Sequence, residues 1–382
     1  MKYYSFLITA LWFGLGVTAS MAQNVTGNFV HDGLTRSYTI YIPANYNAAN
    51  EHPIVFNLHG YTSNGTAQAS LTKMNAIADT AGFIVAYPEG TLDNSSQPYW
   101  NSGYGTGVDD IGFIDALIDT IVANYTVDLQ RVYSTGLSNG GIMSNTLACA
   151  LNHRIAAIAG VAGTMSVAQN AACSPNNKIP VLHIHGTSDI VVPYAGNAAL
   201  LGVNALVAHW RTHNGLTSAS SSTSFSNTNL LDGSTADLIR YETGSNYPVH
   251  LIRVNNGGHS WPGSGVIVSG NTNMDFDASL EIWKFFSQYS LITTTSKIEE
   301  TQRSIWVHVM GANPVQDELQ WQTSITNNYK LSIYNILGEA LFQQEFNRSG
   351  VASAKLANLP TGTYLAVYTT NNKVQTLKFI KA

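Results

Sequence analysis

Ser138 is the serine best placed for nucleophilic chemistry, because it lies in the glycine-flanked run Gly-Leu-Ser-Asn-Gly over 136–140. A strand-like run, 131–135, precedes this motif, and a helical pattern, 142–151, follows it. Glycine lacks a Cβ, so the chain can turn sharply there and expose the hydroxyl as a nucleophile elbow. The short motif is common by itself, and the strand before it and the helix after it make the prediction specific.

A serine hydroxyl needs a general base, and that base needs a group to orient it. Where this elbow occurs, the chain order is serine, acid, histidine. Asp189 follows one buried strand-like run, and His259 follows a later one in a glycine-rich segment. The acidic pair Asp109 and Asp110 precedes Ser138 and breaks the order. We therefore predict a triad of Ser138, Asp189 and His259.

The chain has eleven histidines, so the histidine assignment has competitors. His259 is the only one beyond Asp189 that lies in a glycine-rich loop after a strand-like run. His183 and His185, two residues apart, face one side of a strand and could instead bind a metal. Their surroundings match no strong metal-ligand spacing, which favours buried structural histidines. We predict no metal and no organic cofactor.

Acyl transfer also requires two N–H donors for the oxyanion of its tetrahedral intermediate. We expect one from the backbone of Asn139, the residue after the nucleophile. We expect the other from the backbone of Tyr61, in the loop after the buried run 54–58. The side chains of Tyr61, Trp100 and Trp261 could line a substrate cleft, although ordinary packing explains them equally well.

Short apolar runs alternate with helical patterns from about residue 24 to residue 291. The strand-like runs are 37–42, 54–58, 83–87, 131–135, 155–161, 180–184 and 248–254, and the helical ones are 66–80, 111–122, 142–151 and 276–289. Residues 216–232, rich in Ser, Thr and Asn, read as a loop leading into an exposed strand. Strands separated by helices predict a mainly parallel α/β sheet with helices on both faces. Sites on such sheets lie at the carboxyl ends of the strands.

The pattern changes near the C-terminus. Residues 292–304 lack periodicity and are typical of a linker. From 305 to 382, short alternating strands are separated by turn residues, which predicts a small all-β sandwich. A chain of 382 residues fits one large domain, 23–291, followed by this small one.

The N-terminus is typical of a targeting segment. Lys2 is followed by an apolar stretch, 6–17, and by small residues before position 23. That stretch is short for a bilayer span, so we predict a signal peptide over 1–22, with an uncleaved anchor as the alternative. No later stretch is apolar enough to suggest stable membrane insertion.

The charge and cysteine content of the chain limit the partners and the compartment that we expect for it. Charged residues are 11% of the chain and the net charge is −5, without a basic cluster, which argues against a nucleic-acid partner. The two cysteines, Cys149 and Cys173, could form a disulfide in an oxidising compartment or remain free thiols.

Four motifs together resemble secreted α/β-hydrolases of the polyhydroxybutyrate depolymerase-like and feruloyl esterase-like type. They are His59-Gly60, 136–141, 183–189 and 257–263. The resemblance implies the triad Ser138, Asp189 and His259, hydrolysis of a carboxylic ester through an acyl-enzyme, and a Cys149–Cys173 bridge. Many members have a cysteine where this chain has Tyr61. In having an aromatic residue at this position, the chain is similar to aromatic-polyester hydrolases.

The C-terminal stretch, 305–382, resembles a type IX secretion sorting domain. The match rests on Asn313-Pro314, 331–338, 359–364 and the basic ending 378–381. It implies passage through the periplasm, recognition by the type IX machinery, and a final location outside the cell or at its surface.

The substrate stays open between feruloyl or acetyl esters on polysaccharide and a polyester such as polyhydroxybutyrate. Hydrolysis of an aromatic polyester and peptide hydrolysis on the same fold are the alternatives. A non-catalytic glycan-binding protein is the interpretation least compatible with Ser138, Asp189 and His259 standing in the expected order.

Overall fold

The computed structural model describes residues 22–102, 107–242, 246–291, 307–310, 315–323, 328–335, 339–347, 349–370 and 374–381. The chain divides into two compact units, residues 1–293 and 294–382. The predicted linker 292–304 lies outside the described residues, and so do residues 1–21 of the predicted signal peptide 1–22.

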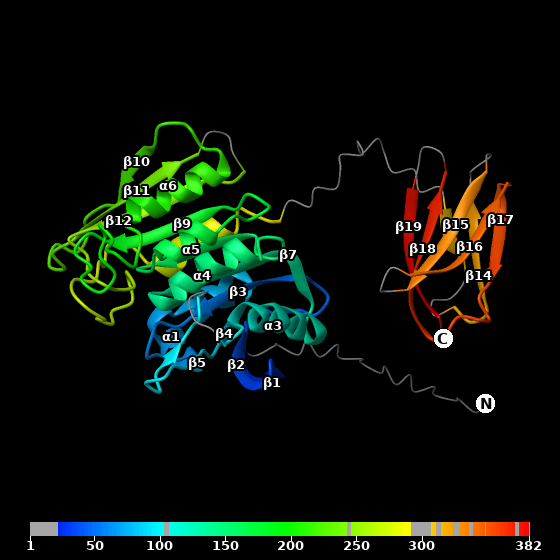
Figure 1. The fold of residues 1–382 in the computed structure, drawn as a ribbon, viewed down its shortest axis with the longest axis horizontal. Coiled ribbons are helices and arrows are strands. Elements are labelled where there is room, and N and C mark those ends of the chain that lie inside the picture. Colours follow the sequence, from blue (N-terminus) through cyan, green and yellow to red (C-terminus); the bar gives the residue numbers. More distant parts are fainter. Residues whose placement is uncertain are drawn as a thin grey trace, which may run out of the picture. The chain divides into compact units, whose positions relative to one another are not determined.

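A ten-stranded sheet forms the centre of the larger unit, in the order β1-β2-β4-β3-β7-β8-β9-β12-β11-β10 (Figure 1). Its strands are β1 Gln23–His31, β2 Leu34–Ile42, β3 His52–Leu58, β4 Ile84–Pro88, β7 Val127–Leu137, β8 Ala157–Val161, β9 Val181–Gly186, β10 Ser221–Ser224, β11 Thr235–Tyr241 and β12 Val249–Asn255. Neighbouring strands run parallel from β4 through to β12, with antiparallel strands at both edges. The predicted mainly parallel sheet is confirmed. A separate two-stranded hairpin joins β5 Thr91–Leu92 to β6 Pro98–Tyr99.

Helices cover both faces of this sheet. They are α1 Gly65–Thr72, α2 Met74–Ala81, α3 Asp110–Asn124, α4 Asn139–Ala150, α5 Val167–Ala172, α6 Val203–Asn214 and α7 Ala278–Phe286. In β3, Ile54 and Phe56 belong to the core shared with α3, α4 and α6, whereas Val55 belongs to the core shared with α1, α2 and α7. Successive side chains of a strand point to opposite faces, so one buried run supplies both cores.

One predicted helix is two helices in the structure. The pattern over 66–80 is interrupted at Lys73, whose φ of 52° lies in the left-handed region and ends α1 before α2 begins. Leu71, Met74 and Ala78 all contribute to the same core, so the apolar face continues across the break. Periodicity therefore could not reveal it.

The predicted loop 216–232 also contains a strand. Its residues 221–224 form β10, which pairs with β11 at the edge of the sheet. All four side chains of β10 are exposed. An edge strand made only of serine and threonine has no buried face, and hydrophobic periodicity cannot detect such a strand.

The smaller unit contains two antiparallel sheets, β13-β14-β17 and β16-β15-β18-β19. The strands are β13 Val307–Met310, β14 Glu318–Thr323, β15 Tyr329–Asn335, β16 Ala340–Phe346, β17 Gly350–Lys355, β18 Gly362–Thr369 and β19 Val374–Lys381. Alternate residues of β14 are buried, and Trp321 Nε1 donates to Tyr329 Oη across the two sheets at 3.0 Å. The predicted all-β unit is confirmed.

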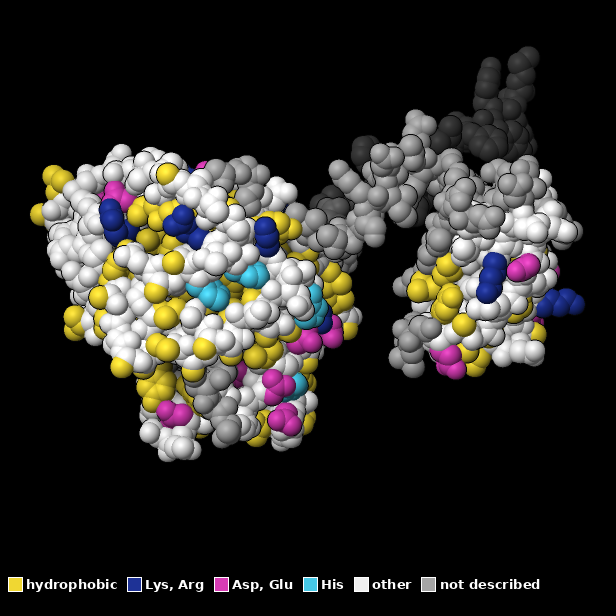
Figure 2. Space-filling model, turned by 45° about the horizontal axis from the view of Figure 1, so that its top comes forward, with side chains coloured by type: hydrophobic (Ala, Val, Ile, Leu, Met, Phe, Trp, Pro, Cys, Tyr) yellow, Lys and Arg dark blue, Asp and Glu magenta, His cyan; other side chains and the backbone are white. Residues whose placement is uncertain are grey.

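Figure 2 shows that charged side chains are sparse on one face of each unit, where most side chains are apolar or uncharged. The composition anticipated this, since few residues are charged. No helix in the described ranges has the length and apolar character needed to cross a membrane.

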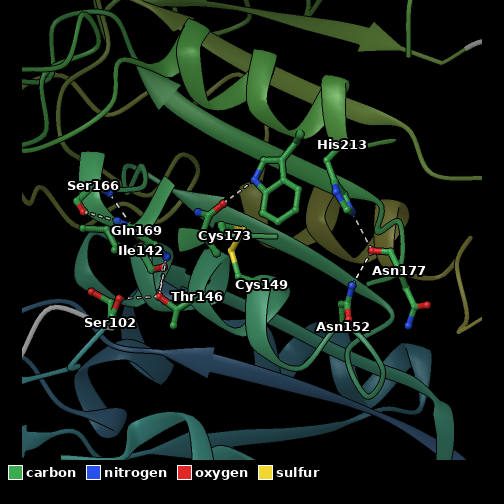
Figure 3. The surroundings of a disulfide bond; sticks show 12 residues. Ser102, Ile142, Thr146, Cys149, Asn152, Ser166, Gln169, Cys173, Asn177 and His213 are labelled. Carbon is green, nitrogen blue, oxygen red and sulfur yellow. Dashed lines mark hydrogen bonds between the residues drawn. A yellow bond between two sulfur atoms is a disulfide. The ribbon is translucent and has the colours of Figure 1, made fainter. Parts of the chain in front are cut away.

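The two cysteines form a disulfide (Figure 3). Cys149 lies in α4, Cys173 caps the end of α5, and their Cα atoms are 5.2 Å apart. A second link joins the same helices, because Gln169 Nε2 donates to Thr146 Oγ1 at 2.7 Å. The bridge implied by the family resemblance is confirmed, and it ties the short helix α5 to α4.

Replacing both cysteines with alanine should destabilise the larger unit by about 3 kcal/mol, because the bridge restricts the unfolded chain. Urea denaturation followed by tryptophan fluorescence would measure this change. Wild-type protein kept in dithiothreitol is the matched control and should approach the stability of the double variant. Equal midpoints for the oxidised wild type and the variant would contradict the expectation.

Candidate active site

Ser138 lies in a sharp turn between β7 and α4. Its φ is 56° and its ψ is −119°, a conformation that L residues rarely adopt. The turn is held in place because Ser138 N–H donates to Val161 O at 2.8 Å. A Cβ on Gly140 would overlap the carbonyl oxygen of Leu58, and one on Gly163 would overlap the carbonyl oxygen of Ser138. Only glycine fits at these two positions beside the serine.

Asp189 and His259 form a buried hydrogen-bonded pair. His259 Nδ1 lies 2.7 Å from Asp189 Oδ2, and each residue is 4% exposed. The other carboxylate oxygen, Oδ1, accepts from the backbone N–H groups of Val191 and Val192, both at 2.8 Å. The loop after His259 is fixed as well, since Ser269 N–H donates to His259 O at 3.1 Å. The carboxylate can therefore hold the imidazole in one orientation.

A second imidazole lies on the other side of this carboxylate. His185 Nε2 is 2.8 Å from the carbonyl oxygen of Val192 and 3.3 Å from Asp189 Oδ2. A carbonyl oxygen only accepts, so this nitrogen carries the proton. The other ring nitrogen, Nδ1, is 3.0 Å from His183 Nε2, and with the His185 proton on Nε2 it accepts the hydrogen bond that His183 Nε2–H donates. The two histidines thus bond to each other and to the loop that carries Asp189.

Burial disfavours the charged form of Asp189, but its hydrogen bonds outweigh that effect. Donation from His185 and His259, the charge of His259 and the N–H of Val192 together hold the pKa of Asp189 well below its usual range. Burial, followed by the nearby charge of His185, lowers the pKa of His183. Asp189 is therefore held ionised, beside a His183 that burial keeps neutral.

The three predicted triad residues follow β7, β9 and β12. In the sheet these strands run parallel within the order β7-β8-β9-β12, so all three side chains come from the same edge. The structure brings Asp189 and His259 into contact. Within the described parts of the chain, Ser138 Oγ forms no hydrogen bond to His259, a kind of contact that is often long before substrate binds.

The loop 59–63 orients the peptide bond that precedes Tyr61. Gly90 N–H donates to His59 Nε2 at 2.9 Å, so the proton of the neutral ring lies on Nδ1, which is 2.8 Å from Gly60 O. Burial lowers the pKa of His59, which favours this neutral form. Ser63 N–H also donates to Gly60 O, at 3.2 Å. Because the peptide is planar and trans, Tyr61 N–H points away from these partners.

Asn139 N–H lies at the first turn of α4, directly after Ser138. Such N–H groups have no acceptor within their own helix. Among the described residues, neither this N–H nor that of Tyr61 donates to a protein acceptor. Both groups are therefore available to donate to a bound ligand.

The aromatic residues predicted to line a cleft occupy different environments. Tyr61 is 48% exposed, and its hydroxyl donates to Asp93 Oδ2 at 2.7 Å. Trp100 and Trp261 are both 1% exposed. Trp261 lies in the core on the α7 face, where its Nε1 donates to Ser279 Oγ at 3.0 Å.

A cleft of about 820 Å³ opens beside Asn139. Apolar and small side chains from four segments line most of it: Tyr99, Trp100, Asn101, Ser102, Asn139, Ile142, Ser166, Val167, Ala168, Ala171, Ala198, Ala199 and Leu200. Figure 3 shows Ser102, Ile142 and Ser166 from this wall close to Thr146 and Gln169. Sequence reasoning missed α5 and 198–200, which have no motif. It also missed the contact of His185 with Asp189, although both lie within the motif 183–189.

Residues 36–233, more than half of the chain, match the family model described as esterase PHB depolymerase. The chain belongs to this family of α/β-hydrolases. Residues 312–382 match the secretion system C-terminal sorting domain. This sorting domain implies export, ending in secretion or attachment to the cell surface.

Several relatives carry esterase names. Feruloyl esterase D of Neurospora crassa is 32% identical over 193 residues, which cover 48% of this chain and 62% of that protein. A bifunctional acetylxylan esterase/xylanase of Neocallimastix patriciarum is 32% identical over 162 residues, covering 42% of this chain and 22% of that protein. The chain thus spans less than two thirds of the length of either relative.

The fold resembles that of an acetyl xylan esterase from Aspergillus awamori. The two structures superpose with a TM-score of 0.52 at 16% sequence identity, over 69% of this chain and 99% of that one. At this identity the comparison supports the shared α/β-hydrolase fold.

The depressed pKa of Asp189 predicts a specific loss of stability in acid. Below about pH 4 the carboxyl of Asp189 binds a proton in the unfolded chain but stays ionised in the folded one. Its contribution to the free energy of unfolding is therefore fully present above that pH and falls as the pH drops. Urea denaturation at pH 6, 4 and 3 should show a smaller acid-induced loss for Asp189→Asn than for the wild type. Asp32→Asn, a change in an exposed turn where the carboxylate forms no hydrogen bond within the described residues, is the control. Parallel pH dependences for Asp189→Asn and the wild type would contradict the expectation.

Proposed function

We propose that this protein hydrolyses carboxylic esters through an acyl-enzyme on Ser138. The observation that carries the proposal is the buried hydrogen bond of 2.7 Å between His259 Nδ1 and Asp189 Oδ2, at the strand edge that also holds Ser138. An imidazole oriented in this way has its other nitrogen available as a general base. Membership in an esterase family and the esterase names of the relatives support the same chemistry.

In the proposed reaction, His259 Nε2 takes the proton of Ser138 as Oγ forms a bond to the ester carbonyl carbon. The N–H groups of Tyr61 and Asn139 stabilise the resulting oxyanion. The C–O bond to the alcohol then breaks, and His259 returns the proton to the leaving oxygen. Water attacks the acyl-enzyme with the same base, which releases the acid and restores Ser138. Asp189 stays ionised throughout and stabilises the imidazolium.

The cleft beside Asn139 is the proposed binding site for the group attached to the reacting carbonyl. Its wall is mostly apolar, with Val167, Ala171 and Leu200 among its members. Such a wall favours an apolar acyl or alcohol group. Feruloyl or acetyl esters on polysaccharide and polyesters such as polyhydroxybutyrate are the proposed substrates, and the sorting domain would deliver the enzyme to such polymers outside the cell.

Ser138→Ala should lower kcat for p-nitrophenyl butyrate by about 10⁴-fold or more, because no other hydroxyl replaces the nucleophile. Ser70→Ala, an exposed serine on α1, is the matched control and should keep wild-type turnover. Circular dichroism would verify that both variants are folded. A fluorophosphonate probe should label the wild type at Ser138, and undiminished turnover in Ser138→Ala would refute the mechanism.

The same preparation can separate the substrate classes. We expect the wild type to release acid from methyl ferulate, from acetylated xylan or from a polyhydroxybutyrate film, and Ser138→Ala to release none. Ala171→Trp would fill part of the cleft and should raise KM for the bulkier esters more than for p-nitrophenyl acetate. Hydrolysis of peptide amides without hydrolysis of any ester would favour the peptidase alternative.

A further inference from the structure

We infer that Trp100 is a positioning residue that holds the two oxyanion donors in one rigid frame. The inference rests on the proposed function, which assigns those donors to the N–H groups of Tyr61 and Asn139. It gives Trp100 a different role from that of a cleft-lining aromatic. Three hydrogen bonds carry it, each to a segment that bears one of the donors.

Two of these bonds join Trp100 to the residue after the nucleophile. Trp100 N–H donates to Asn139 Oδ1 at 2.6 Å, and Asn139 Nδ2 donates to Trp100 O at 3.1 Å. The side-chain amide of Asn139 is therefore paired at both ends with the backbone of one residue. This pairing restrains Asn139 at the start of α4, and with it the direction of its own N–H.

The third bond joins Trp100 to the opposite loop. The indole Nε1–H donates to the carbonyl oxygen of His59 at 2.9 Å, and the centres of the two rings are 5.0 Å apart. His59 in turn hydrogen-bonds through Nδ1 to Gly60 O, the carbonyl of the peptide that carries Tyr61 N–H. A shift of the indole would move the His59 ring and that peptide together.

Trp100 is itself held by its neighbours. Thr62 N–H donates to Pro98 O at 2.9 Å, on the strand that leads into Trp100. On the other side, Asn101 N–H donates to Asp110 Oδ2 at 2.7 Å. The same carboxylate accepts from Arg36 at 2.6 Å, in an ion pair whose side chains are at most 3% exposed. A buried ion pair thus anchors the segment that aligns the two donors.

Substrate contact explains Trp100 less well than this bridging role. The residue is 1% exposed, and its N–H, its C=O and its indole N–H all bond to protein. Little of its surface is left for a ligand, although it forms part of the cleft wall. Oxyanion stabilisation depends on donors placed before the reaction, so the loss of this frame should act on the transition state.

Trp100→Phe tests the inference, because it keeps an aromatic ring and removes the indole N–H. We expect kcat for p-nitrophenyl butyrate to fall about 10- to 100-fold while KM changes less than about threefold, the pattern of an interaction that matters only in the transition state. Trp210→Phe is the matched control. It removes a similarly buried indole donor, which bonds to Asn145 Oδ1 at 2.9 Å, and it should keep kcat within about threefold of the wild type.

Asn139→Ala gives a second test that keeps the backbone N–H of residue 139 and removes both bonds to Trp100. Its kcat should fall by a similar factor, and the double variant should lose less than the product of the two single losses, because both changes disrupt one frame. This variant also decides the matter if Trp100→Phe fails to fold.

Two outcomes would overturn the inference. One is a rise in KM at unchanged kcat in Trp100→Phe, which would make Trp100 a substrate contact. The other is a loss of kcat no larger than that of Trp210→Phe, together with wild-type kcat in Asn139→Ala. If the wild type itself hydrolyses no ester, the proposed function fails, and that result is distinct from either outcome.

Discussion

The site depends on a carboxylate that stays ionised while it is almost completely buried. Asp189 is stable in this form because donors reach both of its oxygens: two backbone N–H groups on one side, His259 and His185 on the other. An unpaired carboxylate in that position would take up a proton, and His259 would then lose the acceptor that fixes its orientation. The position of the loop 187–192 at the end of β9 is what makes these contacts possible.

The remaining parts of the site are set by backbone geometry more than by side-chain chemistry. Ser138 occupies a conformation that costs about 1–3 kcal/mol in an ordinary chain. It persists because its N–H bonds to Val161 and because glycines let β3, β7 and α4 approach closely. The proposed oxyanion donors are likewise main-chain groups. Local strain and close contacts thus concentrate around Ser138, where the proposed reaction takes place.

The sequence was sufficient for the parallel sheet, for the all-β unit and for the pairing of Asp189 with His259, because each has a local pattern or a fixed chain order. It was insufficient for the cleft. The helix α5 has only six residues, and the segment 198–200 belongs to no helix or named strand. The helix α6 was not predicted either, although its sequence carries a helical pattern: one buried face is shared by Val203, Leu206, Val207 and Trp210. Hydrogen-bonded partners such as Trp100 and Asn139 are distant in the chain, and one sequence cannot reveal them.

The covalent tie between α4 and α5 has a consequence for the time at which the protein matures. One wall of the cleft belongs to α5, which is too short to be stable alone and is joined by Cys149 and Cys173 to α4, the helix that follows Ser138. The cytosol keeps thiols reduced, whereas compartments beyond the inner membrane allow them to oxidise. The chain therefore leaves the ribosome without the Cys149–Cys173 bond, which forms only after translocation. The compartment in which this disulfide forms thus determines when the protein reaches its final structure.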